Sequence, residues 1–206
     1  MQRICVYCGS NRGARPEYAD AARDLADVLV TNNLELVYGG ASAGIMGVIA
    51  DRVLEQGGKA HGVIPTSLEK KEIAHPGLTE LHVVASMHER KSTMAGLSDG
   101  FIALPGGYGT LEELIEIVTW GQLQFHEKPV GVLNVRGYFD HLLNYLDHAM
   151  AEGFLKPENR EMLLQDPDPA GLMQQFERYT APRVEKWISS ERRPRRDRRG
   201  PLLPKK

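Results

Sequence analysis

Three glycines and two carboxylates, closely spaced, are the residues of this 206-residue chain best suited to chemistry. They lie in the run Leu104-Pro105-Gly106-Gly107-Tyr108-Gly109-Thr110-Leu111-Glu112-Glu113, between an apolar segment, 100–104, and a segment with helical periodicity. A strand, a glycine turn and a helix start in this order aim free backbone N–H groups and the positive end of a helix at one point. Such a point binds a phosphate or another anion. We expect Thr110 to cap the helix and to offer its hydroxyl to a phosphate oxygen.

The two carboxylates, Glu112 and Glu113, distinguish this loop from known phosphate cradles. A Walker loop needs a Gly-Lys-Ser/Thr tripeptide, which the chain lacks, and the dinucleotide fingerprint needs glycine at position 112. Acidic side chains beside a bound phosphate weaken its binding by repulsion. They are either first-turn acids that complement the helix dipole or groups that take part in the reaction. For two acids beside a glycine loop we favour the second interpretation.

Two motifs resemble those of one enzyme family. Pro105-Gly106-Gly107-x-Gly109-Thr110-x-x-Glu113 resembles the signature of the Lonely Guy (LOG) family, the cytokinin riboside 5′-monophosphate phosphoribohydrolases. Ser86-Met87-His88-Glu89-Arg90-Lys91 resembles the second motif of that family, and the likeness extends from about Ile4 to the region of Asp166. The resemblance implies hydrolysis of the N-glycosidic bond of an adenine-type nucleoside 5′-monophosphate. The products would be the free base and ribose 5-phosphate, with no metal or organic cofactor.

The resemblance also assigns roles to single residues. It implies that Arg90 and Glu113 are the catalytic pair. Glu113 would stabilise oxocarbenium charge on the ribose and orient or deprotonate the attacking water, with Glu112 as support. Arg90 would orient the substrate and contact the leaving base or the ribose hydroxyls. The expected substrate-binding residues are Glu72, Met87, Arg90, Lys91, Gly107, Tyr108, Gly109, Thr110, Leu111, Glu112, Glu113 and Thr119.

Helical spacing places Arg90 on one stripe with Met87 and Met94. Adjacent basic residues are usually a solvated surface pair. The apolar neighbours indicate instead that this face is covered, and a covered arginine needs an anion. His88 and Glu89, within the same motif, are expected at the surface.

These residues are positioned by strands that alternate with helices. Apolar runs predict strands over residues 4–8, 34–38, 60–64, 81–84, 101–104 and 130–134. Helices are predicted from 16, from about 45 to 55, over 86–97, from 110, and near 138–151 and 168–179. This alternation predicts an α/β protein with a single Rossmann-like, doubly wound parallel sheet and helices on both faces. Ligands of such sheets bind at the carboxyl edge, so Gly9, Ser10, Gly39 and Gly40 are additional candidate contacts.

Composition limits the class of protein. With 42% hydrophobic and 25% charged residues, the chain is typical of globular proteins, and residues 1–182 are expected to form one domain. Residues 183–206 contain ten Lys/Arg and three Asp/Glu, which predicts a basic, disordered tail on an acidic body that does not bind nucleic acid. We expect neither a signal peptide nor a membrane span, and a cytoplasmic location.

A metal site is not expected from the sequence. Cys5 and Cys8 have half of a zinc spacing, but on a strand they face opposite ways and no second pair exists. Both are expected to be core residues. The seven histidines form no ligand cluster, and His88 lacks the second histidine of a metalloprotease helix.

Other functions stay open from the sequence alone. A pyridoxal-phosphate lysine decarboxylase, a label long attached to relatives, needs a Schiff-base lysine, and Lys91 is the only lysine in the motifs. The short chain argues against it. A nucleotide-sensing or carrier protein would use the same fold without turnover, although Glu113 beside Arg90 favours an enzyme. Whether the substrate is a cytokinin nucleotide or AMP also stays open. Because smaller relatives are homodimers, a homodimer is expected, in which the loop of Glu72 could reach the neighbouring site.

Overall fold

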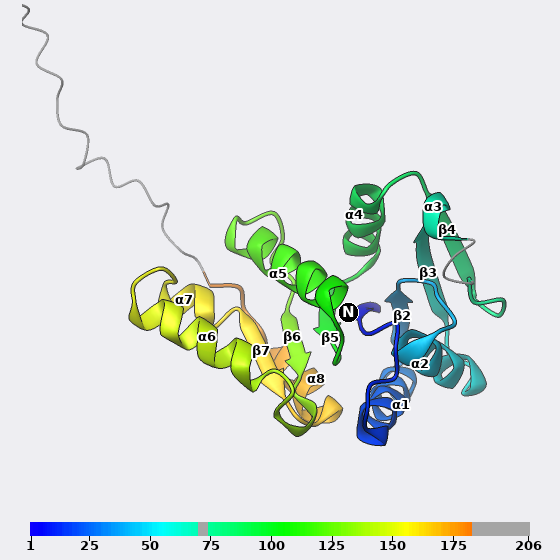
Figure 1. The fold of residues 1–206 in the computed structure, drawn as a ribbon, viewed down its shortest axis with the longest axis horizontal. Coiled ribbons are helices and arrows are strands. Elements are labelled where there is room, and N and C mark those ends of the chain that lie inside the picture. Colours follow the sequence, from blue (N-terminus) through cyan, green and yellow to red (C-terminus); the bar gives the residue numbers. More distant parts are fainter. Residues whose placement is uncertain (70–73, 183–206) are drawn as a thin grey trace, which may run out of the picture.

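The computed structural model describes residues 1–69 and 74–182 (Figure 1). In these residues seven parallel strands form one sheet in the order β4-β3-β2-β1-β5-β6-β7. The strands are β1 (Arg3–Tyr7), β2 (Glu35–Tyr38), β3 (Ala60–Pro65), β4 (Glu80–Val84), β5 (Gly100–Ala103), β6 (Val130–Leu133) and β7 (Leu163–Asp166). Glu72 and the predicted tail, 183–206, lie outside the described residues.

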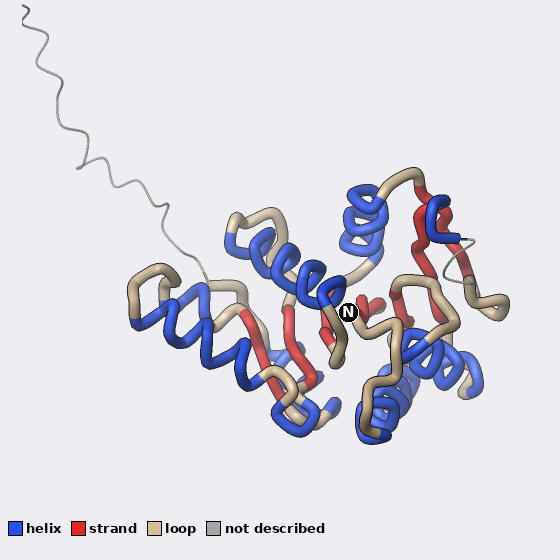
Figure 2. The backbone as a smooth tube through the Cα atoms, viewed as in Figure 1, coloured by secondary structure: helices blue, strands red, loops and turns tan. Residues whose placement is uncertain are grey.

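Helices cover both faces of this sheet (Figures 1 and 2). One face packs against α1, α2 and α8 through residues such as Leu25, Ile49 and Phe176. The other packs against α4, α5 and α6, through Met94 and Leu114 among others. The helices are α1 (Pro16–Thr31), α2 (Gly44–Glu55), α3 (Thr66–Glu69), α4 (Met87–Leu97), α5 (Tyr108–Gln122), α6 (Asp140–Ala151), α7 (Pro157–Arg160) and α8 (Pro169–Arg178). The predicted doubly wound α/β fold is therefore confirmed.

Strand periodicity explains how one segment supplies both layers of the core. In β1, Ile4 and Val6 belong to the cluster under α1 and α2, whereas Cys5 belongs to the opposite cluster. Cys8 lies with the first cluster, so the two cysteines are buried on opposite sides, and both are free thiols. Burial raises the pKa of each thiol, which keeps both neutral. Their prediction as core residues is confirmed.

The predicted strands all occur, but four short elements were not predicted from the sequence: α3, α7, β7 and the 3-10 helix η1 (Val135–Gly137). β7 adds to the edge of the sheet, where Leu163 pairs with Val130. Its sequence, Leu-Leu-Gln-Asp, is too short to show a strand periodicity by itself. No helix among the described residues has the length and apolar character needed to cross a membrane.

The strand order changes direction beside β1. The chain passes from β1 to β2 on one side, and later returns to the other side of β1 as β5. At such a switch the loops that follow the two strands diverge and leave room for a ligand. Here the loops that follow β1 and β5 are also joined by a backbone hydrogen bond, in which Gly9 N donates to Pro105 O over 3.2 Å. The start of α2 joins them, because Ile45 N donates to Gly9 O over 3.0 Å.

Replacing Gly44 by alanine tests this junction. Gly44 has a φ of +65°, and an added Cβ would overlap the backbone of Ser10. Gly57 has a similar φ of +76°, but a Cβ there would have no atom within 4 Å. We expect Gly57→Ala to cost about 1–2 kcal/mol of unfolding free energy for the left-handed backbone. Gly44→Ala should cost about 1–3 kcal/mol more, because the loop after β1 must move. Urea unfolding measures both free energies, and an equal loss in the two variants would contradict the predicted overlap at Gly44.

Candidate active site

The start of α4 is fixed by reciprocal caps in the second motif. Ser86 Oγ accepts a hydrogen bond from Glu89 N over 3.1 Å, and Glu89 Oε2 accepts one from Ala85 N over 2.7 Å. His88 and Glu89 are exposed, as predicted. The predicted stripe is only half covered, because Met94 is 1% exposed and Met87 is 40% exposed. The cap sets the helix so that Arg90 points into the protein.

Arg90 and Glu113 form a buried ion pair between α4 and α5. Arg90 Nη1 donates to Glu113 Oε1 over 3.0 Å, and the exposed fractions of the two residues are 8% and 9%. Arg90 Nε donates to Val63 O over 3.0 Å, which ties the guanidinium to β3 as well. The sequence predicts an anion beside a covered arginine. In the structure that anion is Glu113.

The loop after β2 shapes the other side of the guanidinium. A Cβ on Gly39 would overlap Arg90 Nη2 and would lie 3.0 Å from Met46 Sδ. A side chain at position 39 would therefore displace the guanidinium. Gly40 does not reach the ion pair, since its neighbours are Leu81 and the backbone of β3.

The glycine loop enters α5 earlier than predicted. The helix begins at Tyr108, with Gly107 as its N-cap residue and no side-chain cap. Thr110, in the first turn, is 3% exposed, and a Cβ on Gly106 would overlap its Oγ1. The prediction that Thr110 caps the helix is thus wrong, because Gly107 already occupies the cap position and the threonine packs under the loop. Around Gly107 and Gly109, by contrast, an added Cβ would have no atom within 4 Å.

A cavity of about 200 Å³ lies over this pair at the carboxyl edge of the sheet. It is lined by Val6, Tyr7, Cys8, Gly9, Ser10, Gly39, Met46, Arg90, Gly107, Tyr108, Gly109, Thr110 and Glu113. A second cavity of about 230 Å³ adjoins it and shares Gly9, Ser10 and Gly107. Small-molecule sites occupy about 300–1,000 Å³, so a ligand of nucleotide size would need both cavities.

The negative charge of Glu113 acts on the groups at the end of β1. Burial raises the pKa of Cys8, and the charge of Glu113 raises it further. The pKa of Tyr7 is raised well above its usual value by burial first, and then by Cys5 and Glu113. Cys8 and Tyr7 therefore stay neutral, and Arg90 is the cationic side chain among the residues that line the cavity over the ion pair.

Lys91 forms a separate, more exposed ion network. Its Nζ donates to Glu112 Oε1 over 2.5 Å and to Glu116 Oε1 over 3.0 Å. Burial alone would lower the pKa of Lys91, but the hydrogen bonds to both carboxylates outweigh it and raise the pKa. A Schiff-base lysine reacts as a neutral amine in a cofactor pocket. Lys91 is held charged and does not line the cavity, so it does not fit that role.

The structure therefore divides the predicted site residues. It brings Arg90, Gly107, Tyr108, Gly109, Thr110 and Glu113 together with Gly9, Ser10 and Gly39. Met87, Lys91, Leu111, Glu112, Thr119 and Gly40 do not line the cavity. Thr119 is exposed, and its hydroxyl donates to Ile115 O within its own helix over 2.7 Å. Four further lining residues were not predicted from the sequence: Val6, Tyr7, Cys8 and Met46. The signal for the first three was their place at the carboxyl end of β1 or directly after it.

The fold and the cavity define an α/β protein with a small-ligand site at the switch in strand order, built on a helix N-terminus and a buried carboxylate–guanidinium pair. A family model described as "Possible lysine decarboxylase" matches residues 46–176. The cytokinin riboside 5′-monophosphate phosphoribohydrolase LOG5 of Arabidopsis thaliana is 52% identical over 179 residues, 87% of this chain and 78% of that protein. The probable enzyme of the same kind LOGL1 of Oryza sativa subsp. japonica is 50% identical over 195 residues, 92% of this chain and 87% of that protein. The chain belongs to the LOG family, which confirms the resemblance.

Solved structures share the fold at lower identity. The molybdenum cofactor binding protein of Rippkaea orientalis matches with a TM-score of 0.65 and 18% identity, over 86% of this chain and 96% of that one. The Moco carrier protein of Chlamydomonas reinhardtii matches with a TM-score of 0.64 and 19% identity, over the same shares. At these identities the likeness shows the fold alone.

Alanine at Gly106 and at Gly109 should have opposite effects on stability. At Gly106 the new Cβ would overlap Thr110 and lie 2.9 Å from Gly9 N, so Gly106→Ala should lower the free energy of unfolding by about 1–3 kcal/mol. At Gly109, a helical position with free space, alanine should raise it by about 0.5–1 kcal/mol. Urea unfolding of both variants measures the difference. A destabilised Gly109→Ala would show that this glycine also packs inside the protein.

Proposed function

We propose that the protein hydrolyses the N-glycosidic bond of adenine-type, cytokinin nucleoside 5′-monophosphates and releases the free base and ribose 5-phosphate. The observation that carries this proposal is the buried Arg90–Glu113 pair beside the glycine loop. The relatives that are about half identical to this chain are named as phosphoribohydrolases, which supports the same activity. We infer that AMP is cleaved as well as the cytokinin nucleotides.

Glu113 performs the central step in this proposal. Departure of the base builds positive charge on the ribose, and a carboxylate beside C1′ stabilises that charge. The same carboxylate orients the attacking water and accepts its proton. Because Glu113 is nine-tenths buried, its charge is weakly screened by solvent and acts strongly on a sugar bound in the cavity.

Arg90 and the glycine loop position the substrate. Arg90 Nε and Nη1 are fixed by Val63 O and Glu113, so the guanidinium presents a preorganised edge to the leaving base or the ribose hydroxyls. The 5′-phosphate binds at the N-terminus of α5, where Gly107 and Gly109 leave the backbone N–H groups uncovered. Binding energy at the phosphate then holds the ribose in place for attack.

We also propose the domain, the location and the partners of the enzyme. We assign the activity to a domain of residues 1–182, place the enzyme in the cytoplasm, and expect neither a nucleic acid nor a membrane partner. We further infer that Glu72, Met87, Lys91, Leu111, Glu112 and Thr119 contribute to substrate binding in the assembled enzyme. The described residues of this set do not line the cavity of one chain, so the proposal requires a second subunit to complete the site.

The phosphate provides the first test of the function. Reverse-phase chromatography of reactions with AMP, isopentenyladenosine monophosphate and adenosine separates the free bases. We expect both nucleotides to be cleaved and adenosine to react at least about a hundredfold less efficiently, because several charge-assisted contacts of about 1.5–3 kcal/mol each are lost. Equal kcat/KM for AMP and adenosine would show that the glycine loop does not bind the phosphate. Absence of any base release would refute the proposed activity.

Glu113→Gln separates chemistry from binding. Glutamine keeps an oxygen to accept the Arg90 hydrogen bond, but it can neither oppose an oxocarbenium charge nor take a proton from water. We expect a folded variant that binds AMP and whose turnover falls by a factor on the order of 10²–10⁴. Glu116→Gln is the matched control on the same helix, because Lys91 keeps its bond to Glu112. If Glu113→Gln kept normal turnover, the catalytic group would be Glu112 or a residue outside α5.

We propose that the enzyme is a homodimer in which the loop of Glu72 reaches the site of the neighbouring subunit. Light scattering at micromolar protein should give twice the mass of the 22.9 kDa chain. A monomer with full activity would remove Glu72 and Thr119 from the proposed site.

A further inference from the structure

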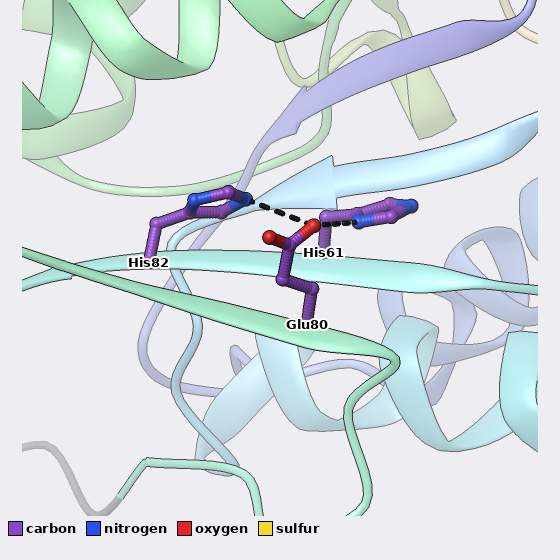
Figure 3. Close-up of side chains that lie close together, drawn as sticks. All are labelled: His61, Glu80 and His82. Atoms are coloured by element: carbon purple, nitrogen blue, oxygen red, sulfur yellow. Dashed lines mark ion pairs between the residues drawn. The ribbon is translucent and has the colours of Figure 1, made fainter.

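Two histidines and a glutamate meet on β3 and β4, outside the cavity that holds Arg90 and Glu113. In the sheet register His61 lies beside Glu80, and His82 follows two positions later on the same face of β4. Figure 3 shows the two imidazole rings on either side of the Glu80 carboxylate, with both contacts ending on one oxygen. His61 comes from a distant part of the sequence, so only strand pairing brings the three side chains together.

The distances between these groups match those around a metal ion. Glu80 Oε2 lies 3.5 Å from His61 Nδ1 and 3.4 Å from His82 Nε2, and the three atoms lie within 4.8 Å of one another. In a tetrahedral zinc site with bonds of about 2.0–2.1 Å, neighbouring ligand atoms are separated by about 3.3–3.4 Å. The Glu80 oxygen therefore already lies at this spacing from both nitrogens.

The two nitrogen atoms lack hydrogen bonds within the described residues. His61 Nδ1 and His82 Nε2 are both buried atoms without a hydrogen-bond partner there, and His61 as a residue is 4% exposed. A buried polar atom without a partner costs free energy, so each such atom needs an explanation. A bound cation would satisfy both nitrogens and the carboxylate at once.

Glu35 orients the first histidine. Its Oε2 lies 2.9 Å from His61 Nε2, and its carboxylate also accepts hydrogen bonds from Arg3 and Lys59 over 2.8 and 2.9 Å. With the proton of His61 on Nε2, the nitrogen with a free lone pair is Nδ1, which lies 3.5 Å from Glu80 Oε2. Histidine ligands of metals commonly have such a carboxylate on their other nitrogen, which fixes the ring and its tautomer.

We propose that His61, Glu80 and His82 bind one Zn²⁺ ion, with Glu35 as the positioning residue behind His61. Two imidazoles and a carboxylate suit Zn²⁺ and do not suit Mg²⁺, which prefers oxygen ligands. The Glu80 side chain is 56% exposed and that of His82 is 26% exposed, so an ion can enter from solvent and a water can complete its coordination.

The ion would link β3 to β4 at the edge of the sheet. β4 is the outermost strand on its side, and its contacts with β3 hold it in place. His61 lies two positions before Val63, whose carbonyl accepts the hydrogen bond of Arg90 Nε. Zinc would therefore stabilise the segment of β3 that positions Arg90, without taking part in the reaction itself.

Calorimetric titration of the untagged full chain, treated with a chelator, tests the proposal. We expect ZnCl₂ to bind with one ion per chain and to raise the Tm, and MgCl₂ to do neither. His82→Gln and Glu80→Gln replace partly exposed residues of an edge strand, so both should fold, and each should weaken zinc binding at least tenfold. His141→Gln, an exposed histidine on α6, is the matched control and should bind like the unchanged protein.

Either of two results would overturn the proposal. One is the absence of saturable zinc binding at neutral pH. The other is zinc binding that both His82→Gln and Glu80→Gln leave unchanged, which would place the ion elsewhere.

Discussion

The buried ion pair between Arg90 and Glu113 is the interaction around which the site is arranged. Removing two charges from water costs several kcal/mol for each, and the attraction between them repays this only when the geometry is good. Here the carbonyl of Val63 provides a further acceptor, and three elements, α4, α5 and β3, are joined at one point. Such a pair contributes little net stability, so its position at the cavity is better explained by function than by folding.

The glycines around this pair have two distinct tasks. Gly39 and Gly106 allow close approach within the protein, of the guanidinium in one case and of Thr110 in the other. Gly107 and Gly109 face free space at the start of α5, where close approach is possible only for a ligand. One short motif therefore contains both a packing glycine and glycines that face open space, and their surroundings, not their sequence positions, distinguish them.

The strand β3 links the site to the edge of the sheet. Its Val63 carbonyl fixes Arg90, and its His61 side chain meets two residues of the outermost strand β4. Edge strands have few contacts and open easily, so a ligand-binding cluster at this edge would restrain the part of the sheet next to Arg90. Stability at the edge and precision at the site would then depend on the same strand.

The sequence by itself determined the alternation of strands and helices, the phosphate-type loop and the two family motifs, because periodicity and contiguous motifs are local properties. It did not distinguish Glu112 from Glu113 except through the family resemblance. The structure does so: Glu113 is buried against Arg90, whereas Glu112 is exposed beside Lys91. One residue turns the side chain by about 100° around the helix, so burial depends on what packs against α5. The short strand β7 and the histidine cluster were likewise decided only by pairing between distant segments, which no local pattern encodes.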